Sequence, residues 1–339
     1  MTDTMDATAF TRGPAAALFS SYVAAAAVSA ASELGILDVL ARQDCYDIPA
    51  ATASAGLDET VVRRLLAALV WAGAVRVERD EATPGPQFDA LYAARGYFYW
   101  LVRGCGGLFS DAGAAVSAQR VGEFYTRDMR AVAIGSRLIG DALVEPLFDE
   151  ILDGLHINMI ADLGCGSGQR LLRVADRHPK VRGLGIDIAP QAVELANLSI
   201  DQAGQAHRLT VVQGDVLDLG AFDPCTEVEV VTCVFMGHDF WPRERCVAAL
   251  SSLRRAFPNA SQLLLCDVVR SDCAPGPDTG IFTLGFELIH ALMGVYLPAR
   301  EEWLGAFADA GWELVRAIDV AAPPGCVLFD LRPARATAR

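Results

Sequence analysis

The sequence predicts an α/β protein in two parts: a mainly helical N-terminal winged-helix domain, then a Rossmann-like, mostly parallel sheet of seven strands. Three observations predict this fold class. The chain has 339 residues, of which 53% are hydrophobic, enough for one large domain or two ordinary ones. Residues 14–155 have helical patterns almost throughout. After Gly154, short apolar strands alternate with helices, as in a parallel sheet covered on both faces.

The N-terminal domain is expected over residues 14–152, after a disordered tail at 1–13. The stretch Pro14–Ser32 carries no charge and many small residues, which favours a helix packed closely on a partner over a membrane span. Within residues 57–78, a helix begins at the N-cap Asp58, ends near Gly73 and leads into a strand. Its predicted apolar stripe is Val61, Leu65 and Leu69, with Val62 and Leu66 beside it. Residues 83–89 are predicted as a turn and 90–152 as helix.

A helix followed by such a strand is typical of a winged helix, which either reads DNA or serves packing and dimerisation. The chain has 28 Lys and Arg against 42 Asp and Glu, a formal charge of −14, and Arg63 and Arg64 are the only basic residues of that helix. Because nucleic-acid affinity depends on cationic side chains, we expect no nucleic-acid partner. The uncharged N-terminal helix instead indicates a homodimer built through this domain.

Cysteines and the N-terminus bear on the compartment. The nine cysteines are scattered without a C-x-x-C pair, so neither a disulfide framework nor a structural zinc site is indicated. The first residues lack a basic segment followed by an apolar core, the pattern of a secretory signal. We therefore expect a cytoplasmic protein without membrane association.

The second domain is expected over residues 153–339. Helices are predicted at Gln169–Arg177, Gln191–Gln202 and Arg243–Ala256. Between them lie the predicted strands Asn158–Leu163, Gly183–Ile188, Leu209–Gln213, Val228–Phe235, Gln262–Val269, Leu314–Val320 and Cys326–Leu331.

A glycine-rich loop, Gly164–Gly168 (GCGSG), connects the first of these strands to a helix. Glycine allows a sharp turn and leaves no Cβ between the backbone and a ligand. Asp187 ends the second strand, where a carboxylate can bridge two ribose hydroxyls, and Asp215 follows the third, where it can accept from an exocyclic amine. Taken singly, each acid fits a cap or a turn equally well. Together they predict a cofactor site: Asp162, Gly164, Gly166, Gly168, Asp187 and Asp215.

A nicotinamide dinucleotide is the competing cofactor, but its fingerprint has a third glycine where this chain has Gln169. The set of DLGCGSG (162–168), Asp187 and Gly214-Asp215 resembles the class I S-adenosylmethionine-dependent methyltransferases over about residues 155–331. The resemblance implies that S-adenosyl-L-methionine is bound, with Val216 and Cys233 also at the cofactor.

The order of the two domains is similar to that of the plant-type small-molecule O-methyltransferases, a resemblance that implies a dimer joined through the N-terminal helices. Those enzymes carry a His-Asp pair after the fourth strand, and here His238 and Asp239 stand in that place. In a metal-free O-methyltransferase, His238 would be the general base that removes a phenol proton. His238 and Asp239 are therefore candidate catalytic residues.

Residues 281–298 (IFTLGFELIHALMGVYLP) add a second feature. Glu287 and His290 are three residues apart on a predicted helix, so both project from one face of an apolar stretch. Such groups are costly to bury unless they are paired or bind a ligand. One interpretation is a buried Glu–His ion pair. The other joins Glu287 and His290 with His238 in a two-histidine, one-carboxylate metal site.

GHDFWPRERC (237–246) with FTLGFELIHALMGVYLP (282–298) resembles the methyltransferases that act on C3 of phenylpyruvate and related 2-oxo acids in peptide-antibiotic pathways. That resemblance implies a metal, iron or zinc, bound through His238 and His290. A cation chelated by the substrate would stabilise the enolate whose C3 attacks the sulfonium methyl. Arg127 is a candidate clamp for the substrate carboxylate, or else a surface partner of Asp128 or Glu123. The candidate apolar wall is Tyr99, Trp100, Met236, Phe240, Phe286 and Met293, and Cys105 follows Gly104 where a hydroxyl would bind substrate more firmly.

The leading hypothesis is thus a 2-oxo acid C-methyltransferase that acts through a metal-chelated enolate. A metal-free O-methyltransferase with His238 as base is the alternative within enzymes. A winged-helix regulator that senses S-adenosylmethionine or a metabolite is the alternative from another class.

Overall fold

The computed structural model describes residues 11–116, 127–221, 225–272, 274–276, 279–320 and 325–335. The described chain forms two compact units, one that extends to Ala142 and one that begins at Leu143. The helix that spans Glu145–Asp153, which precedes the predicted domain boundary at 152/153, groups with the second unit.

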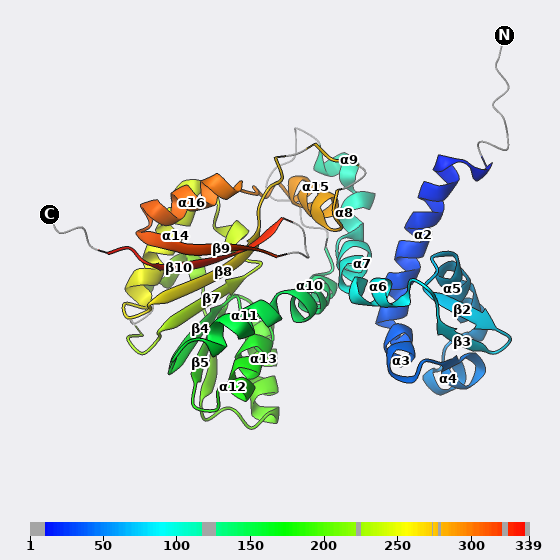
Figure 1. Cartoon of the computed structure of the whole chain (residues 1–339), viewed down its shortest axis with the longest axis horizontal. Coiled ribbons are helices and arrows are strands. Elements are labelled where there is room, and N and C mark those ends of the chain that lie inside the picture. The colour runs from blue at the N-terminus through cyan, green and yellow to red at the C-terminus, as the bar shows by residue number, and fades with distance from the viewer. Residues whose placement is uncertain are drawn as a thin grey trace, which may run out of the picture. The chain divides into compact units, whose positions relative to one another are not determined.

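The first unit holds a small antiparallel sheet with strand order β1-β3-β2. Its strands are β1 (Tyr46–Asp47), β2 (Val75–Glu78) and β3 (Glu81–Pro84), and β3 lies in the centre. The predicted turn at 83–89 therefore begins too early, because Thr83 and Pro84 pair with Arg76 and Val75. Four helices come from the same part of the chain: α2 (Pro14–Glu33), α3 (Ile36–Gln43), α4 (Ile48–Ala55) and α5 (Glu59–Trp71) (Figure 1).

Helix α5 begins as predicted, since the Asp58 carboxylate accepts a hydrogen bond from Val61 N at 3.1 Å. Its buried face differs from the predicted stripe. Val62, Leu66 and Leu69 are buried in the core of this unit, whereas the side chain of Val61 is 65% exposed. Both sets recur at helical spacing, so packing against α2 and the sheet decides which one is buried.

Helix α2 is long and apolar enough to cross a membrane by length and composition. Ala27, Val28 and Ala31 nevertheless lie in the core of the first unit, where small side chains let neighbouring helices approach closely. The first turns of the same helix expose large apolar side chains: Leu18 (75% exposed), Phe19 (74%) and Tyr22 (68%). One face of α2 therefore has a partner within its own unit, and the other is open.

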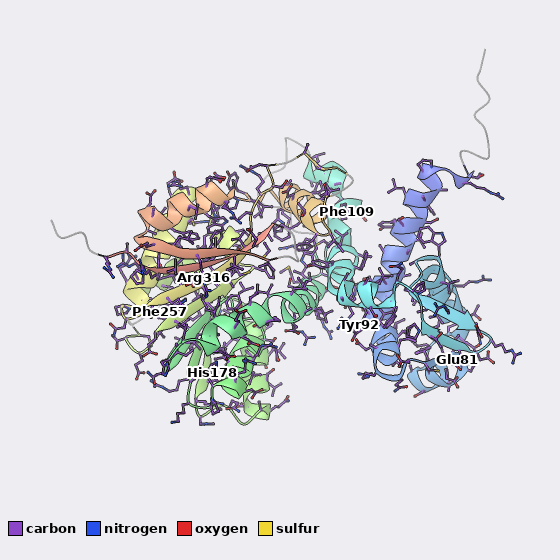
Figure 2. The ribbon with its side chains drawn as sticks, in the orientation of Figure 1. Glu81, Tyr92, Phe109, His178, Phe257 and Arg316 are labelled. Atoms are coloured by element: carbon purple, nitrogen blue, oxygen red, sulfur yellow. The ribbon has the colours of Figure 1, made fainter. Side chains whose placement is uncertain are left out.

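The rest of the first unit is helical, as predicted. Its elements are α6 (Phe88–Ala93), α7 (Arg95–Phe98), the π-helix η1 (Tyr99–Gly104), α8 (Gly106–Ser110), α9 (Ala112–Ala115) and α10 (Met129–Leu143). Tyr92 of α6, labelled in Figure 2, donates a hydrogen bond to the Asp38 carboxylate at 2.9 Å and so fixes α6 to α3.

The second unit is built on a seven-stranded sheet in the order β6-β5-β4-β7-β8-β10-β9. All pairs from β6 to β8 are parallel, and β10 is antiparallel to both of its neighbours. This confirms the predicted mostly parallel sheet of seven strands. The strands are β4 (Met159–Leu163), β5 (Arg182–Asp187), β6 (Leu209–Gln213), β7 (Val230–Val234), β8 (Gln262–Val268), β9 (Trp312–Val320) and β10 (Cys326–Pro333).

Helices cover both faces of this sheet (Figure 1). On one side lie α11 (Glu145–Asp153), α12 (Gln169–Arg177) and α13 (Pro190–Gln202), and on the other α14 (Arg243–Ala256) and α16 (Arg300–Asp309). Because both faces are covered, strands such as β8 are apolar and buried almost throughout. Shorter elements follow individual strands: the 3₁₀ helices η2 (Val216–Ala221) and η3 (Gly237–Phe240), and helix α15 (Thr283–Met293).

The strand order reverses direction at β4, whose neighbours are β5 on one side and β7 on the other. In open α/β sheets, ligands bind beyond the carboxyl ends of the strands at such a switch point. The fold therefore predicts a ligand site at the segments after β4, β5, β6 and β7, which contain the glycine loop, Asp215 and His238.

Candidate functional site

The glycine loop follows β4 directly and turns through left-handed backbone conformations. Gly164, Gly166 and Gly168 have φ values of +64°, +53° and +74°. At Gly164 a Cβ atom would lie 2.5 Å from the sulfur of Met236, so a side chain is excluded there. At Gly166 nothing lies within 4 Å of that position, so the backbone borders open space. The loop thus packs against Met236 at Gly164 and leaves space for a ligand beside Gly166.

Asp187 joins the ends of β4 and β5. Its carboxylate accepts hydrogen bonds from Gly166 N and from Ala189 N, each at 2.9 Å. The structure therefore brings Asp187 onto the glycine loop, and each carboxylate oxygen keeps acceptor capacity for a ligand hydroxyl. Asp215 follows β6 and accepts from Leu217 N at 2.8 Å, which is an Asx-type turn at the next strand end.

Asp162 lies within β4 and is only 1% exposed. One of its oxygens, Oδ1, accepts from Arg170 at 2.9 Å and from the Thr232 hydroxyl at 2.7 Å. Arg170 also donates to Glu145 at 2.6 Å. Sequence reasoning found Asp162 but missed its two partners, Arg170 of α12 and Thr232 of β7, and the Glu145 carboxylate of α11 that also holds Arg170.

Two further predicted cofactor residues have buried side chains. Cys233 of β7, which pairs with Leu163 of β4, is fully buried in the hydrophobic core of the second unit. Burial raises the pKa of that thiol well above its ordinary value. Val216, the first residue of η2, is 6% exposed and belongs to the same core.

His238 is held by a buried carboxylate that the sequence analysis missed. Asp267, in β8, accepts from the backbone N–H of His238 and from its Nδ1, both at 2.8 Å. The backbone makes this possible, because Phe235 adopts φ +53° after β7 and Gly237 passes beside the Asp267 carboxylate. An acid in the otherwise apolar strand QLLLCDV was the available signal. Asp239, the other candidate catalytic residue after β7, is exposed.

His290 of α15 faces His238, with 4.9 Å between ring centroids. Its Nδ1 bonds the carbonyl of Phe286 at 2.7 Å, and a carbonyl only accepts, so Nδ1 carries the proton. Asp267 imposes the same tautomer on His238. In each neutral ring the lone pair is therefore on Nε2, the arrangement found in metal-ligating and general-base histidines.

Glu287 does not complete a three-ligand set with these histidines. Its carboxylate accepts from Ser271 N at 2.7 Å and so ties α15 to the segment after β8. Across the described ranges, no group of three or more His, Cys, Asp or Glu is arranged to hold a metal ion. In the described part of the chain the predicted Glu287–His290–His238 cluster is therefore not assembled: the two histidines face each other, and Glu287 accepts from the Ser271 backbone.

Aromatic rings surround the histidine pair. Phe286 lies 3.9 Å from His290 and 5.7 Å from His238, and Phe282 lies 4.9 Å from Phe286, measured between ring centroids. Of the predicted apolar wall, Phe286 is therefore beside the histidines. Phe240 belongs to the hydrophobic core beneath α14, and Met293 is 1% exposed.

The remaining predicted residues belong to the first unit, and the structure does not place them relative to His238. Asp128, a suggested partner of Arg127, pairs with Arg103 at 2.9 Å, and Glu123 lies outside the described residues. Tyr99 and Trp100 are buried in the π-helix. Cys105 is fully buried, and burial raises the pKa of its thiol to about 12, so it stays protonated at neutral pH.

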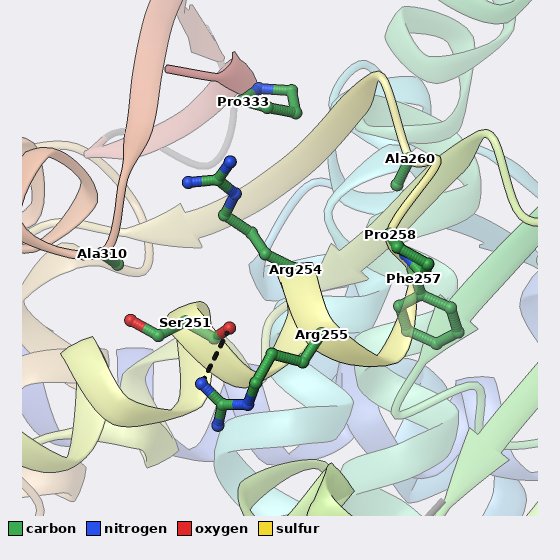
Figure 3. Close-up of a pocket in the computed structure, with 8 residues that line it drawn as sticks. All are labelled: Ser251, Arg254, Arg255, Phe257, Pro258, Ala260, Ala310 and Pro333. Carbon is green, nitrogen blue, oxygen red and sulfur yellow. Dashed lines mark hydrogen bonds between the residues drawn. The ribbon is translucent and has the colours of Figure 1, made fainter. Parts of the chain in front are cut away.

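A separate hollow of about 360 Å³ lies at the opposite edge of the sheet. Arg254 and Arg255 at the end of α14 border it together with Phe257, Ala260 and Pro333 (Figure 3). These residues flank the start of β8 and the end of the antiparallel β10, so the hollow lies away from the carboxyl ends that carry the glycine loop. Arg254 donates to the Gly311 carbonyl at 3.0 Å, which is a structural role.

Comparison with known proteins gives the same picture. Residues 160–258 match the methyltransferase domain family. Methyltransferase ungE' of Aspergillus campestris is 39% identical over 332 residues, which cover 95% of this chain and 97% of that protein. Indolepyruvate C-methyltransferase of Streptomyces griseus is 30% identical over 94% of this chain and 95% of its own length. The 2-ketoarginine methyltransferase of Streptomyces arginensis is 25% identical over 79% of each.

Solved structures with this fold include a putative O-methyltransferase from Nostoc punctiforme. It superimposes with a TM-score of 0.69 at 17% identity and covers 96% of this chain and 100% of its own. PigF, solved with SAH, gives a TM-score of 0.67 at 19% identity over 95% and 99% of the two chains. At these identities the likeness concerns the fold.

Proposed function

The chain belongs to the class I S-adenosylmethionine-dependent methyltransferases, and from this premise we propose that it methylates C3 of a 2-oxo acid. The observation that carries the proposal is the pair His238 and His290, each with Nδ1 bonded to a protein acceptor and Nε2 carrying the lone pair. His238 follows β7, the neighbour of the strand that leads into the glycine loop, and His290 comes from α15, which follows β8. Relatives named for indolepyruvate and 2-ketoarginine, both 2-oxo acids, support the substrate class.

The cofactor residues in this proposal are the glycine loop and the acids around it. Asp187 would accept from the ribose hydroxyls, Asp215 would border the adenine, and Asp162 would face the amino-acid part. S-adenosylmethionine is a sulfonium cation with an ammonium group, so acids suit it. The cofactor would lie between these carboxylates and the open side of Gly166.

His238 and His290 fit a metal ion in their donor atoms and in the groups behind them. A ligating imidazole almost always donates its other N–H to a carboxylate or carbonyl, and Asp267 and the Phe286 carbonyl fill these roles here. With two protein ligands, further positions would be left for the C1 carboxylate and C2 carbonyl of the substrate. A bound iron or zinc ion would stabilise the negative charge that the C2 oxygen gains when C3 loses its proton.

The protein's own residues set up the methyl transfer in three ways. The histidine pair orients the substrate at the end of β7, and the adjacent glycine loop orients the sulfonium, so that C3 attacks the methyl group in line. Asp267 keeps the His238 ring and backbone in one position. The Phe282 and Phe286 rings exclude water from the reacting carbon.

The same rings favour an aromatic or apolar substrate side chain. Phe286 lies against both histidines, and Glu287, the nearest acid in the sequence, is engaged by Ser271 N. Burying a cationic side chain against these rings would be costly without an acidic partner. We therefore expect phenylpyruvate- or indolepyruvate-like acids to be used in preference to 2-ketoarginine.

Product analysis tests the proposal directly. The enzyme is incubated with S-adenosylmethionine and a panel of phenylpyruvate, indolepyruvate, a branched aliphatic 2-oxo acid and 2-ketoarginine, and products are identified by mass spectrometry. Methylation at C3 of the aromatic acids is expected, with loss of deuterium from C3-labelled substrate. Removal of metal by a chelator should abolish turnover and added metal should restore it. A methyl group on oxygen, or full activity of metal-free enzyme, would overturn the proposal.

The second candidate is a metal-free O-methyltransferase, which the His238–Asp267 pair specifically favours. A buried carboxylate on Nδ1 stabilises the imidazolium that forms when Nε2 takes a proton from a phenol. Under this alternative, His238→Ala is inactive and chelation has no effect. His290→Ala separates the two further, because it should abolish C-methylation together with metal binding while leaving the binding of S-adenosylhomocysteine intact.

Assembly is part of the same proposal. We infer a homodimer through the N-terminal winged-helix domain, supported by the open apolar face of α2 formed by Leu18, Phe19 and Tyr22. A DNA-reading role is disfavoured. The Arg63 guanidinium of α5 is engaged by Glu59, by Asp80 and by the Arg79 carbonyl, which leaves little of it for a phosphate.

A further inference from the structure

The carboxylate of Asp162 belongs to a buried charged triad whose other members are Arg170 and Glu145. The three side chains are 1%, 12% and 8% exposed. One guanidinium serves two carboxylates, so the triad carries a net charge of −1 in the interior of the second unit. Buried charge of this kind is costly unless an opposite charge joins it.

The open position in this triad is on Asp162. Its Oδ1 accepts from both Arg170 and Thr232, whereas its Oδ2 has no hydrogen-bond partner among the described residues and is shielded from solvent. Asp162 is two residues before Gly164, the first residue of the glycine loop. A single cationic hydrogen-bond donor at Asp162 Oδ2, beside the loop that would hold the cofactor, would therefore both satisfy this oxygen and neutralise the charge of the triad.

We propose that Arg170 is a positioning residue for the cofactor: held by Glu145, it fixes Asp162 so that the free oxygen receives the ammonium group of S-adenosylmethionine. The inference rests on the proposed cofactor but not on the methylated substrate. The Arg170 fork spans from Glu145 Oε1 to Asp162 Oδ1, and Thr232 bonds the same Asp162 oxygen, so the carboxylate is held from two sides.

Helices α11 and α12 hold Arg170 itself in place. Its guanidinium lies over the Phe148 ring, 5.0 Å from the centroid, and burial alone would lower its pKa. The two carboxylates outweigh burial and raise that pKa above its ordinary value, so Arg170 stays a cation. Farther along the same two helices, Arg173 pairs with Asp149 through three hydrogen bonds of 2.5–3.0 Å. This second pair does not touch Asp162 and offers a matched control.

The test compares three ligands by calorimetry on the full chain. S-adenosylhomocysteine has both the ammonium and the carboxylate, decarboxylated S-adenosylmethionine keeps only the ammonium, and 5′-methylthioadenosine has neither. For Arg170→Met we expect affinity for the first two to fall about 10–100-fold, as for other residues that orient a ligand-binding group, with 5′-methylthioadenosine unchanged. Thr232→Val should show the same selectivity to a smaller degree, and Arg173→Met should bind all three normally.

Two further variants keep the test decisive. If Arg170→Met does not fold, the double variant Arg170→Met with Glu145→Gln removes one charge of each sign, and Arg170→Lys keeps the charge but lacks the fork. Equal loss of all three ligands would mean a structural role and overturn the inference. Loss of S-adenosylhomocysteine alone would mean that Arg170 binds the cofactor carboxylate directly, which also overturns it. Failure of the wild-type protein to bind any of them would instead refute the proposed cofactor.

Discussion

At the scale of single residues, the site depends on which acid stands behind His238. Asp239 is adjacent in the chain, but in the 3₁₀ helix η3 its side chain points to solvent. Asp267 is 29 residues away and takes both the backbone N–H and the ring Nδ1 of His238. It also accepts from Val268 N at 2.7 Å, so the carboxylate is itself fixed. Whether His238 binds a metal or a proton, Asp267 sets which nitrogen is available.

Asp267→Asn tests this assignment. We expect kcat to fall about 10–100-fold, because a neutral amide holds the ring and its tautomer less firmly, while affinity for S-adenosylhomocysteine stays unchanged. Steady-state kinetics and calorimetry measure the two quantities. Asp330→Asn is the matched control, since Asp330 is a buried strand carboxylate that Gln262 and Arg316 hold away from the histidines. An unaltered kcat in Asp267→Asn would show that His238 is positioned without it.

At the scale of elements, the conformation of the glycine loop depends on how closely β4, β5 and α12 approach one another. Gly185 lies in the middle of β5, where a Cβ would stand 2.7 Å from the sulfur of Cys165 and 2.8 Å from Val211. Cys165 is part of the glycine loop. Burial raises the pKa of its thiol, and the negative charges of Asp162 and Asp187 raise it further. The strand glycine thus leaves room for a loop residue to pack against the sheet.

Gly185→Ala should therefore disturb both stability and cofactor binding. Overpacking of a filled core costs about 1–3 kcal/mol, and displacement of Cys165 would move the loop. Calorimetric unfolding should show a lower transition temperature, and S-adenosylhomocysteine should bind more weakly. Gly113→Ala in α9 is the control, because a Cβ there meets nothing within 4 Å. Wild-type stability in Gly185→Ala would mean that β5 and the loop adjust at no cost.

At the scale of the whole molecule, α2 has two faces with different tasks. Ala27, Val28 and Ala31 form part of the first unit's own core, so deletion of the first 35 residues would damage that core as well as any interface. The exposed Phe19 and Tyr22 are the better probes of assembly, since they lie outside the core.

Phe19→Glu with Tyr22→Glu should convert a dimer into a folded monomer. Two charges on an apolar contact surface must be desolvated when the surfaces meet, which disfavours association. Sedimentation velocity measures the change. Val315→Glu, at a 52% exposed apolar position of β9 in the second unit, is the control and should stay dimeric. A wild-type protein that sediments as a monomer would contradict the inferred dimer.

The sequence by itself determined the elements whose signals are local. The strand Leu209–Gln213 and the helices Gln169–Arg177 and Arg243–Ala256 occur with the predicted bounds, because apolar periodicity, caps and glycines act over a few neighbouring residues. The glycine loop and the acids at the ends of β5 and β6 were predictable for the same reason: each stands at the end of a recognisable strand, and parallel strands bring their carboxyl ends to one edge.

Tertiary structure alone decided which side chains meet. Val62 rather than Val61 is buried, Asp267 rather than Asp239 holds His238, and Glu287 turns to Ser271 rather than to His290. Arg170 carries no motif of its own, yet it joins α11 and α12 to Asp162. Each of these outcomes depends on contacts between residues that are distant in the chain: which residue supplies a hydrogen-bond partner, or which face of a helix is buried. Spacing along the sequence gives the direction of a side chain within its own element, whereas its partner depends on how separate elements pack.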